Sequence, residues 1–225
     1  MKFKVSELAI VQLGYQQREK NDSRSIGTHK LLQVKDVVTE GRFLEYFESS
    51  MGIWTGNLHM VTPKGQAWKY QIQPGDVLFV AKGNRNYGIA IDPRWVRPYP
   101  ESWENVLASS HFYILRPSVQ RIIPEYLAWC LNQPSTQSLL QSIATGSLMK
   151  MIPKISFENI LLDVPTIEIQ RKIIDLQFLS EQERYLMNSI SKKRSLIIQT
   201  VCDKAAKEMN QEPVENKHER TDQPR

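Results

Sequence analysis

The clearest pattern of hydrophobic and polar positions lies near the C-terminal end of the chain. Residues 166–209 contain neither glycine nor proline, and apolar residues recur there at steps of three and four. This spacing places the apolar side chains along one stripe of an α-helix, about 60 Å long at 1.5 Å per residue. Glu183 and the pair Lys193 and Arg194 interrupt the stripe. Its members are Ile169, Ile173, Leu176, Leu179, Leu186, Ile190, Ile197, Val201 and Ala205.

A long helix with a narrow apolar stripe must bury that stripe against another helix. The stripe could fold back onto the rest of its own chain, but the preceding sequence offers no second helix of comparable length. We therefore expect a coiled coil, formed either with a partner protein or with a second copy of the chain. The segment 210–225 is polar and almost free of apolar residues, which predicts a disordered tail.

Residues 1–165 show a different sequence pattern, in which short apolar runs are separated by glycine, proline, asparagine and aspartate. Apolar runs over 31–38, 70–81 and 109–117 predict strands. Helices are predicted over 124–134, where Pro124 suits a first turn, and over 135–144, with Ser135 as the N-cap and Gly146 as the stop. We expect an α+β fold: a globular domain over 1–165 with a mixed or antiparallel sheet and short helices.

Composition and charge narrow the classes of function. The 225 residues carry a net charge of +5, and because the tail 208–225 holds five acids and three bases, the rest of the chain carries +7. A basic body favours a polyanionic partner. Apolar runs stop well short of the roughly 18 residues that span a bilayer, and Glu7 interrupts the N-terminal run, so we expect a cytoplasmic protein.

The metal-binding residue types are scattered. The two cysteines, Cys130 and Cys202, have neither CxxC spacing nor a nearby histidine pair. This pattern indicates neither a zinc site nor a disulfide framework. The histidines are equally dispersed, so we expect no metal site; they are His29, His59, His111 and His218.

The stretch QIQPGDVLFVAKGNRN, residues 71–86, contains the most concentrated candidate chemistry. It lacks the spacing of a phosphate-binding loop. A nuclease would need a carboxylate two residues before Lys82, where Val80 stands, and Asp76 is interpreted as a turn residue. Arginine can bind guanine, asparagine can bind adenine and lysine can neutralise phosphate, so the loop suits base reading; the alternative is a solvated polar turn. The candidates are Lys82, Asn84, Arg85, Asn86 and Tyr87.

A second candidate is TGSLMKMIPK, residues 145–154. Ser147, Lys150 and Lys154 offer one hydroxyl and two cations after a glycine, which is typical of a phosphate clamp. The basic and aromatic stretch around Arg42 is a weaker candidate.

Over most of residues 1–205 the sequence resembles the specificity (S) subunits of type I restriction-modification systems. The resemblance is carried, in order, by VSELAIVQLGYQQR, LLQVKDV, YQIQPGDVLFVAKG, SSHFYILRP, PEYLAWCLNQP and ATGSLMKMIPKISFENILLDVPTIEIQRKI. Its most specific part is Val164, Pro165 and Gln170, the segment by which such proteins join a target recognition domain to a long helix. The chain departs from the usual form at Thr166, Ile167 and Ile169.

The resemblance implies a non-catalytic subunit of half the usual size, with one target recognition domain and one long helix. Two copies in a C2 dimer would read an inverted repeat. The implied partners are double-stranded DNA, a methyltransferase that binds S-adenosylmethionine, and in some systems a motor-nuclease subunit. The chain lacks the motifs of an adenine methyltransferase and the Walker loop of a motor, so we expect no enzyme activity. Two alternatives stay open: a subunit of another phage-defence assembly, and a protein-interaction adaptor that has lost DNA binding.

Overall fold

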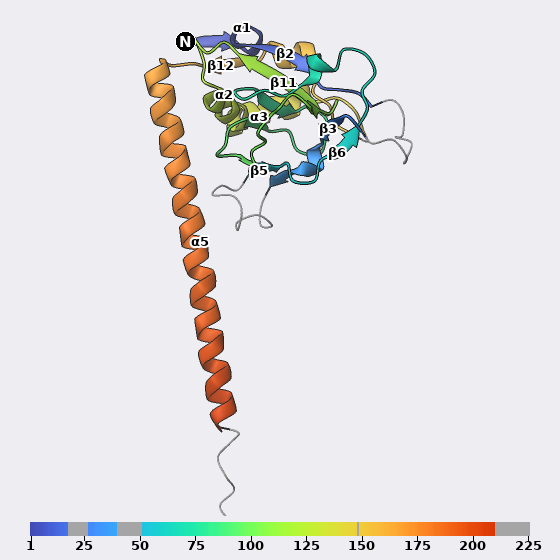
Figure 1. The fold of residues 1–225 in the computed structure, drawn as a ribbon. Coiled ribbons are helices and arrows are strands. Elements are labelled where there is room, and N and C mark those ends of the chain that lie inside the picture. Colours follow the sequence, from blue (N-terminus) through green and yellow to red (C-terminus); the bar gives the residue numbers. More distant parts are fainter. Residues whose placement is uncertain (18–26, 40–50, 148, 210–225) are drawn as a thin grey trace, which may run out of the picture. The chain divides into compact units, whose positions relative to one another are not determined.

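The computed structural model describes residues 1–17, 27–39, 51–147 and 149–209 (Figure 1). The chain divides into two units, Met1–Glu183 and Arg184–Arg225. The first unit is a mixed α+β structure, as the sequence predicts, with antiparallel and mixed sheets, short helices and the beginning of a long helix. The second unit contains the rest of that helix.

The central sheet of the first unit has four antiparallel strands in the order β2-β11-β7-β8. All four side chains of β7 are buried, because Val77 and Phe79 join one core cluster while Leu78 and Val80 join another. Burial on both faces explains why β7 reads as a continuous apolar run instead of an alternating one. The strands are β2 (Ala9–Leu13), β7 (Val77–Val80), β8 (Gly88–Ala90) and β11 (Phe112–Pro117).

Two helices follow β11 in sequence, and α2 (Pro124–Asn132) packs on β7 and β8. At its end the Asn132 side chain accepts a hydrogen bond from the Gly88 backbone N–H and donates one to the Gly88 carbonyl, both at 2.8 Å. The next helix, α3 (Pro134–Ile143), corrects the prediction of Ser135 as its N-cap and Gly146 as its stop. Pro134 occupies the first turn because its missing N–H costs nothing there, and Gln133 is the cap.

Two smaller sheets lie beside the central one. One has the order β10-β3-β6 and the other β4-β5-β9. The strand predicted over 31–38 is interrupted, since the 3-10 turn η1 (Val34–Asp36) divides it and the Asp36 carboxylate accepts a 2.8 Å bond from the Gln33 N–H. The remaining elements here are β3 (His29–Leu32), β4 (Val37–Thr39), β5 (Met51–Trp54), β6 (His59–Val61), η2 (Ala67–Tyr70), β9 (Val96–Arg97) and β10 (Val106–Ala108).

The beginning and end of this fold lie side by side. β1 (Lys2–Lys4) pairs antiparallel with β12 (Leu161–Asp163), as Figure 1 shows. The short helices α1 (Val5–Leu8) and α4 (Lys154–Glu158) flank this pair and are in contact. Phe157 of α4 is fully buried and stacks on Phe79, with the ring centroids 4.5 Å apart. The pairing fixes the position from which the long helix starts.

The long helix, α5 (Ile167–Met209), confirms the helix predicted over 166–209. Its first turns are anchored by Gln170, which is completely buried. The Gln170 amide donates to the carbonyl oxygens of Arg121 and Pro165, both at 2.9 Å, and accepts a 3.0 Å bond from the Ile123 N–H. The Val-Pro-x4-Gln segment thus has a physical role, because one side chain satisfies three backbone groups from two separate parts of the chain.

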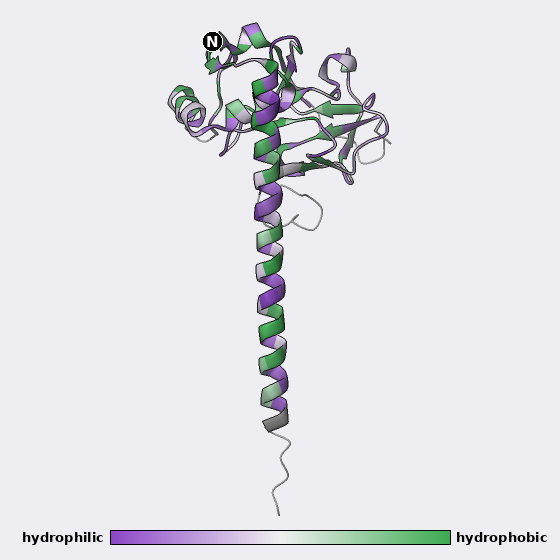
Figure 2. Cartoon of the chain, turned by 90° about the vertical axis from the view of Figure 1, so that its left-hand side faces the viewer, coloured by the Kyte–Doolittle hydropathy of each residue, from purple (hydrophilic) through white to green (hydrophobic). Residues whose placement is uncertain are grey.

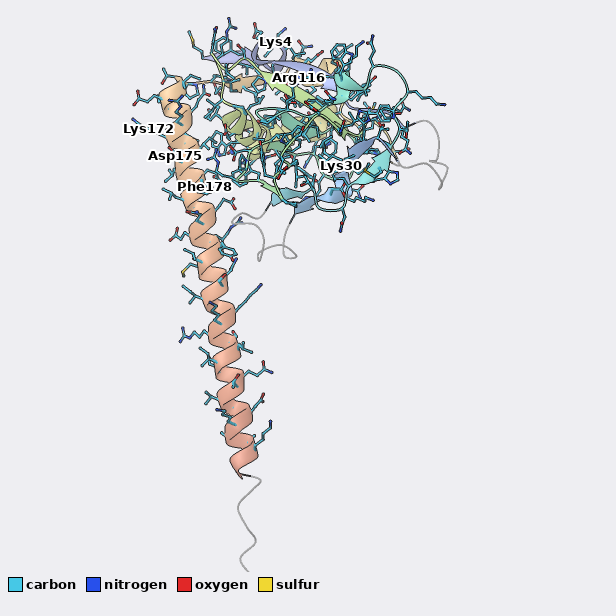
Figure 3. The ribbon with its side chains drawn as sticks, in the orientation of Figure 1. Lys4, Lys30, Arg116, Lys172, Asp175 and Phe178 are labelled. Carbon is cyan, nitrogen blue, oxygen red and sulfur yellow. The ribbon has the colours of Figure 1, made fainter. Side chains whose placement is uncertain are left out.

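Further along the first unit, α5 contacts its own domain through one side only. Ile174 is buried, and Phe178 (labelled in Figure 3) meets the Trp95 ring edge-on at 6.2 Å and the Arg94 guanidinium at 5.6 Å. Leu176 and Leu179 remain 69% and 60% exposed. Figure 2 shows hydrophobic segments recurring along α5. No helix in the described part of the chain is long and apolar enough to cross a membrane.

Candidate nucleic-acid interface

The two segments with candidate DNA chemistry are hydrogen-bonded to each other. Lys82 and Met151 form an antiparallel bridge. On either side of it the Gly83 N–H donates to the Lys150 carbonyl at 3.1 Å, and the Ile152 N–H donates to the Ala81 carbonyl at 2.9 Å. The loop after β7 and the segment 145–154 therefore form one continuous surface, although nearly 70 residues separate them in sequence.

Within the first loop the five predicted residues have different surroundings. The Asn86 amide donates a 2.8 Å bond to the Val80 carbonyl, so its donor closes the β7–β8 hairpin. Tyr87 is half-buried against the core, and this burial raises its pKa to about 12. Lys82 is half-buried, whereas Asn84 and Arg85 at the tip are exposed. The side chains best placed to reach a base edge are those of Asn84 and Arg85.

The second segment is a tight loop closed on itself. The Thr145 and Met151 backbones exchange hydrogen bonds of 2.9 and 2.8 Å. Gly146 has φ +98°, and a Cβ at this position would lie 2.5 Å from the Met149 carbonyl oxygen, so glycine is required. Ser147, Lys150 and Lys154 are exposed. The Lys154 ammonium also lies 3.4 Å from the Glu158 carboxylate, one turn later on α4.

Beside this bridge lies a hollow that the sequence does not predict. Its volume is about 360 Å³, and its walls include Leu13, Tyr113, Met151 and Ile155, with Lys82 and Lys154 also lining it. The Tyr113 hydroxyl supports the wall by donating to the Ile152 carbonyl at 2.7 Å. The lining of the hollow comes from four separate parts of the chain, at residues 13, 82, 113 and 151–155, so no local pattern indicates it. An apolar floor with cationic edges suits the sugar and base edges of a nucleic acid.

His111 is a further titratable group near this surface. The His111 carbonyl accepts hydrogen bonds from the Ala81 and Lys82 N–H groups at 2.8 and 3.2 Å. Burial, together with the nearby Lys82 charge, lowers the pKa of the His111 imidazole, which keeps it neutral near pH 7. No group of metal-binding side chains occurs among the described residues. Arg42 lies outside the residues that the structure describes.

Asp76 closes its own turn, as the sequence predicts: its carboxylate accepts a 2.8 Å bond from the Gln73 N–H. Although the Arg116 Nε lies 3.7 Å away, burial raises the pKa of Asp76 to about 6. The folded state therefore binds this proton more tightly than the unfolded chain, in which an aspartate has a pKa of about 3.9. The resulting stabilisation is present below about pH 4 and is lost as the pH rises through 6.

We expect Asp76 to lower the free energy of unfolding by up to about 3 kcal/mol as the pH rises from 4 to 7. Asp76→Asn should remove that component, which can be measured as the wild-type-minus-variant difference in urea unfolding across this range. Asp175→Asn, which neutralises an exposed carboxylate on α5, is the matched control and should leave the pH dependence unchanged. A difference that stays constant with pH for Asp76→Asn would show that its pKa is not raised.

The predicted partner residues of α5 are mostly uncovered within the chain. Ile173 is the exception, since it packs partly against the domain core. The exposed members are Ile169, Leu176, Leu179, Leu186, Ile190, Ile197 and Val201.

No protein-family model and no curated protein matches this chain. Among solved structures, the type I restriction-modification S subunit from M. genitalium is similar, with 14% identity and a TM-score of 0.47, over 87% of this chain and 43% of that one. The HsdS subunit from Thermoanaerobacter tengcongensis is similar with 14% identity and a TM-score of 0.47, over 85% of this chain and 39% of that one. A third structure, of a type I R-M system, has 15% identity and a TM-score of 0.47, over 91% of this chain and 45% of that one. The chain thus spans less than half the length of these chains.

Proposed function

We propose that this chain is a non-catalytic DNA recognition subunit of a type I restriction-modification system. In this proposal the domain 1–165 reads one half-site on double-stranded DNA, and the helix 166–209 docks the partner subunits. The main support for this proposal is that the segments 82–87 and 145–154 are hydrogen-bonded to each other and form one surface. That surface combines exposed base-reading side chains with the cations that phosphate contacts require.

The chemistry would reside in other subunits. An adenine methyltransferase that binds S-adenosylmethionine is directed to the site by this chain, and a motor-nuclease subunit joins where the system has one. Two copies of this chain pair through α5 and read a bipartite inverted repeat. The exposed apolar residues of α5 support this arrangement, because a stripe that is left uncovered in the single chain requires a partner.

The test is co-expression of the chain with the methyltransferase encoded beside it, followed by sequencing for methylated adenines with and without this chain. We expect methylation at a defined, bipartite and palindromic motif that disappears without the chain. A stable complex that methylates no motif would instead support the adaptor that has lost DNA binding. A motif without dyad symmetry would contradict the dimeric part of the proposal only.

Substitution of Arg85 tests base reading at the exposed loop tip. We expect Arg85→Ala to weaken binding to the specific duplex by roughly ten- to a hundredfold, the worth of one bidentate base contact, and to change binding to a scrambled duplex less than threefold. Lys150→Ala, on the joined segment, is the comparison and should weaken both equally, because phosphate contacts carry no sequence information. Competition binding on the two duplexes measures these ratios. Equal losses on both duplexes for Arg85→Ala would rule out base reading by this residue.

A further inference from the structure

A cavity of about 230 Å³ lies between α2, β8 and the first turns of α5. None of the residues that line it belongs to the segments 82–87 or 145–154, so it is distinct from the proposed DNA surface. Sites for drug-sized ligands have volumes of about 300–1,000 Å³, so this smaller cavity suits a single long side chain. The residues that decide its chemistry are Trp95, Glu125, Trp129, Gln177 and Glu181.

The walls of the cavity are held in place by contacts within the chain. Two 2.8 Å hydrogen bonds between Asn132 and Gly88 fix α2 to β8. The start of α5 is fixed by the buried Ile174 and by the Phe178 ring, which meets the Trp95 ring edge-on at 6.2 Å. Because these walls are formed in the single chain, a ligand can bind without paying for their ordering.

Two carboxylates line the cavity, and both can accept more hydrogen bonds than they do within the chain. The Glu181 carboxylate accepts a 3.1 Å bond from the Gln177 amide, and the Glu125 carboxylate accepts a 2.8 Å bond from the Arg94 guanidinium. An ionised carboxylate has about four acceptor sites. Among the described residues, no lysine or arginine lines the cavity itself, although Arg94 reaches Glu125 from beside it. A ligand for this site must therefore bring hydrogen-bond donors and positive charge.

The apolar part of the lining includes two tryptophans, Trp95 and Trp129. Indole rings attract cations over their faces, and arginine makes this contact more often than lysine. The chain already contains one such contact next to the lining residues, because the Arg94 guanidinium lies 5.6 Å from the centroid of the Phe178 ring. A guanidinium meets both requirements of the cavity, since its N–H groups are all donors and its plane stacks on aromatic rings.

We propose that this cavity binds a guanidinium group, presented by an arginine side chain of a protein that docks along the start of α5. The carboxylates of Glu125 and Glu181 accept its N–H groups, and the two tryptophans cover its plane. Leu176 and Leu179, exposed on the same turns of α5, give the partner an adjoining apolar contact. Arginine is one of the residue types that dominate binding energy at protein interfaces. The inference rests on the docking role of α5 in the proposed function and adds the site and the anchoring residue type.

The cavity is tested on the full chain with N-acetyl-arginine amide, by two-dimensional NMR of the indole N–H groups. The chain has five tryptophans, and tryptophan-to-phenylalanine variants identify the signals of Trp95 and Trp129. We expect both signals to shift, at a concentration roughly tenfold or more below that needed for N-acetyl-citrulline amide, which has a similar shape but no charge. Glu181→Gln should weaken binding roughly tenfold or more. Asp175→Asn, which removes the same charge at an exposed position of α5, should change it less than about threefold. Equal binding of both compounds, or no shift of either signal, would overturn the proposal.

The source of the arginine is tested by binding of the methyltransferase encoded beside the chain, measured by calorimetry without DNA. We expect Glu181→Gln to raise the dissociation constant of the complex roughly tenfold or more, and Asp175→Asn to change it less than about threefold. Equal affinities of the two variants would overturn the assignment of the guanidinium to this partner. A wild-type chain that does not bind the methyltransferase would contradict the docking role in the proposed function, whereas the NMR measurement tests the cavity without any partner. Neither measurement involves DNA, so failure here is distinguishable from failure of DNA recognition.

Discussion

Replacing Gln170 with leucine is expected to lower the free energy of unfolding by about 4 kcal/mol, because this fully buried side chain is the hydrogen-bond partner of three backbone groups. The Ile123 N–H and the carbonyl oxygens of Arg121 and Pro165 all bond to this one side chain. Leucine has a similar volume, so packing is retained while the hydrogen bonds are lost. Urea denaturation followed by circular dichroism measures the change.

Gln177→Leu is the matched control, two turns further along the same helix. Its side chain is half-buried and donates only to the Glu181 carboxylate within the helix, at 3.1 Å. We expect a change below about 1 kcal/mol there, because only one side-chain hydrogen bond within the helix is lost. A similar loss for both variants would indicate a general effect on α5, and a negligible loss for Gln170→Leu would show that water satisfies the freed groups.

Neutralising the three lysines of the joined surface should have the largest effect on DNA binding. We expect a triple variant to bind duplex DNA about a hundredfold more weakly at moderate salt. Its three substitutions to glutamine are at Lys82, Lys150 and Lys154. Each phosphate contact that is lost should reduce the slope of log K against log salt by about 0.9, so the three together should reduce it by about 2.7. Fluorescence anisotropy at several salt concentrations gives both quantities.

The control for this variant is the same loss of charge placed on α5, with Lys192, Lys204 and Lys207 changed to glutamine. These lysines are exposed and belong to the second unit of the chain. A salt slope that falls equally in both triple variants would mean that only net charge matters. An unchanged slope for the triple variant at the joined surface would place the DNA contacts elsewhere on the chain.

The sequence by itself determined those features that depend on neighbouring residues. The three- and four-residue steps over 166–209 identified α5, Pro124 identified the start of α2, and the Pro-Gly-Asp turn identified the role of Asp76. Each is decided within one or two turns of the chain, where local spacing and capping chemistry dominate.

Only the tertiary structure decided which distant groups meet. Nothing local to Lys82 indicates that it pairs with Met151, or that the Asn86 amide is used within its own hairpin while Arg85 is exposed. Two of the three bonds of Gln170 reach groups almost 50 residues earlier in the chain. Such pairings result from the packing of the whole domain, in which every buried polar group needs a partner and the partner can come from any part of the chain.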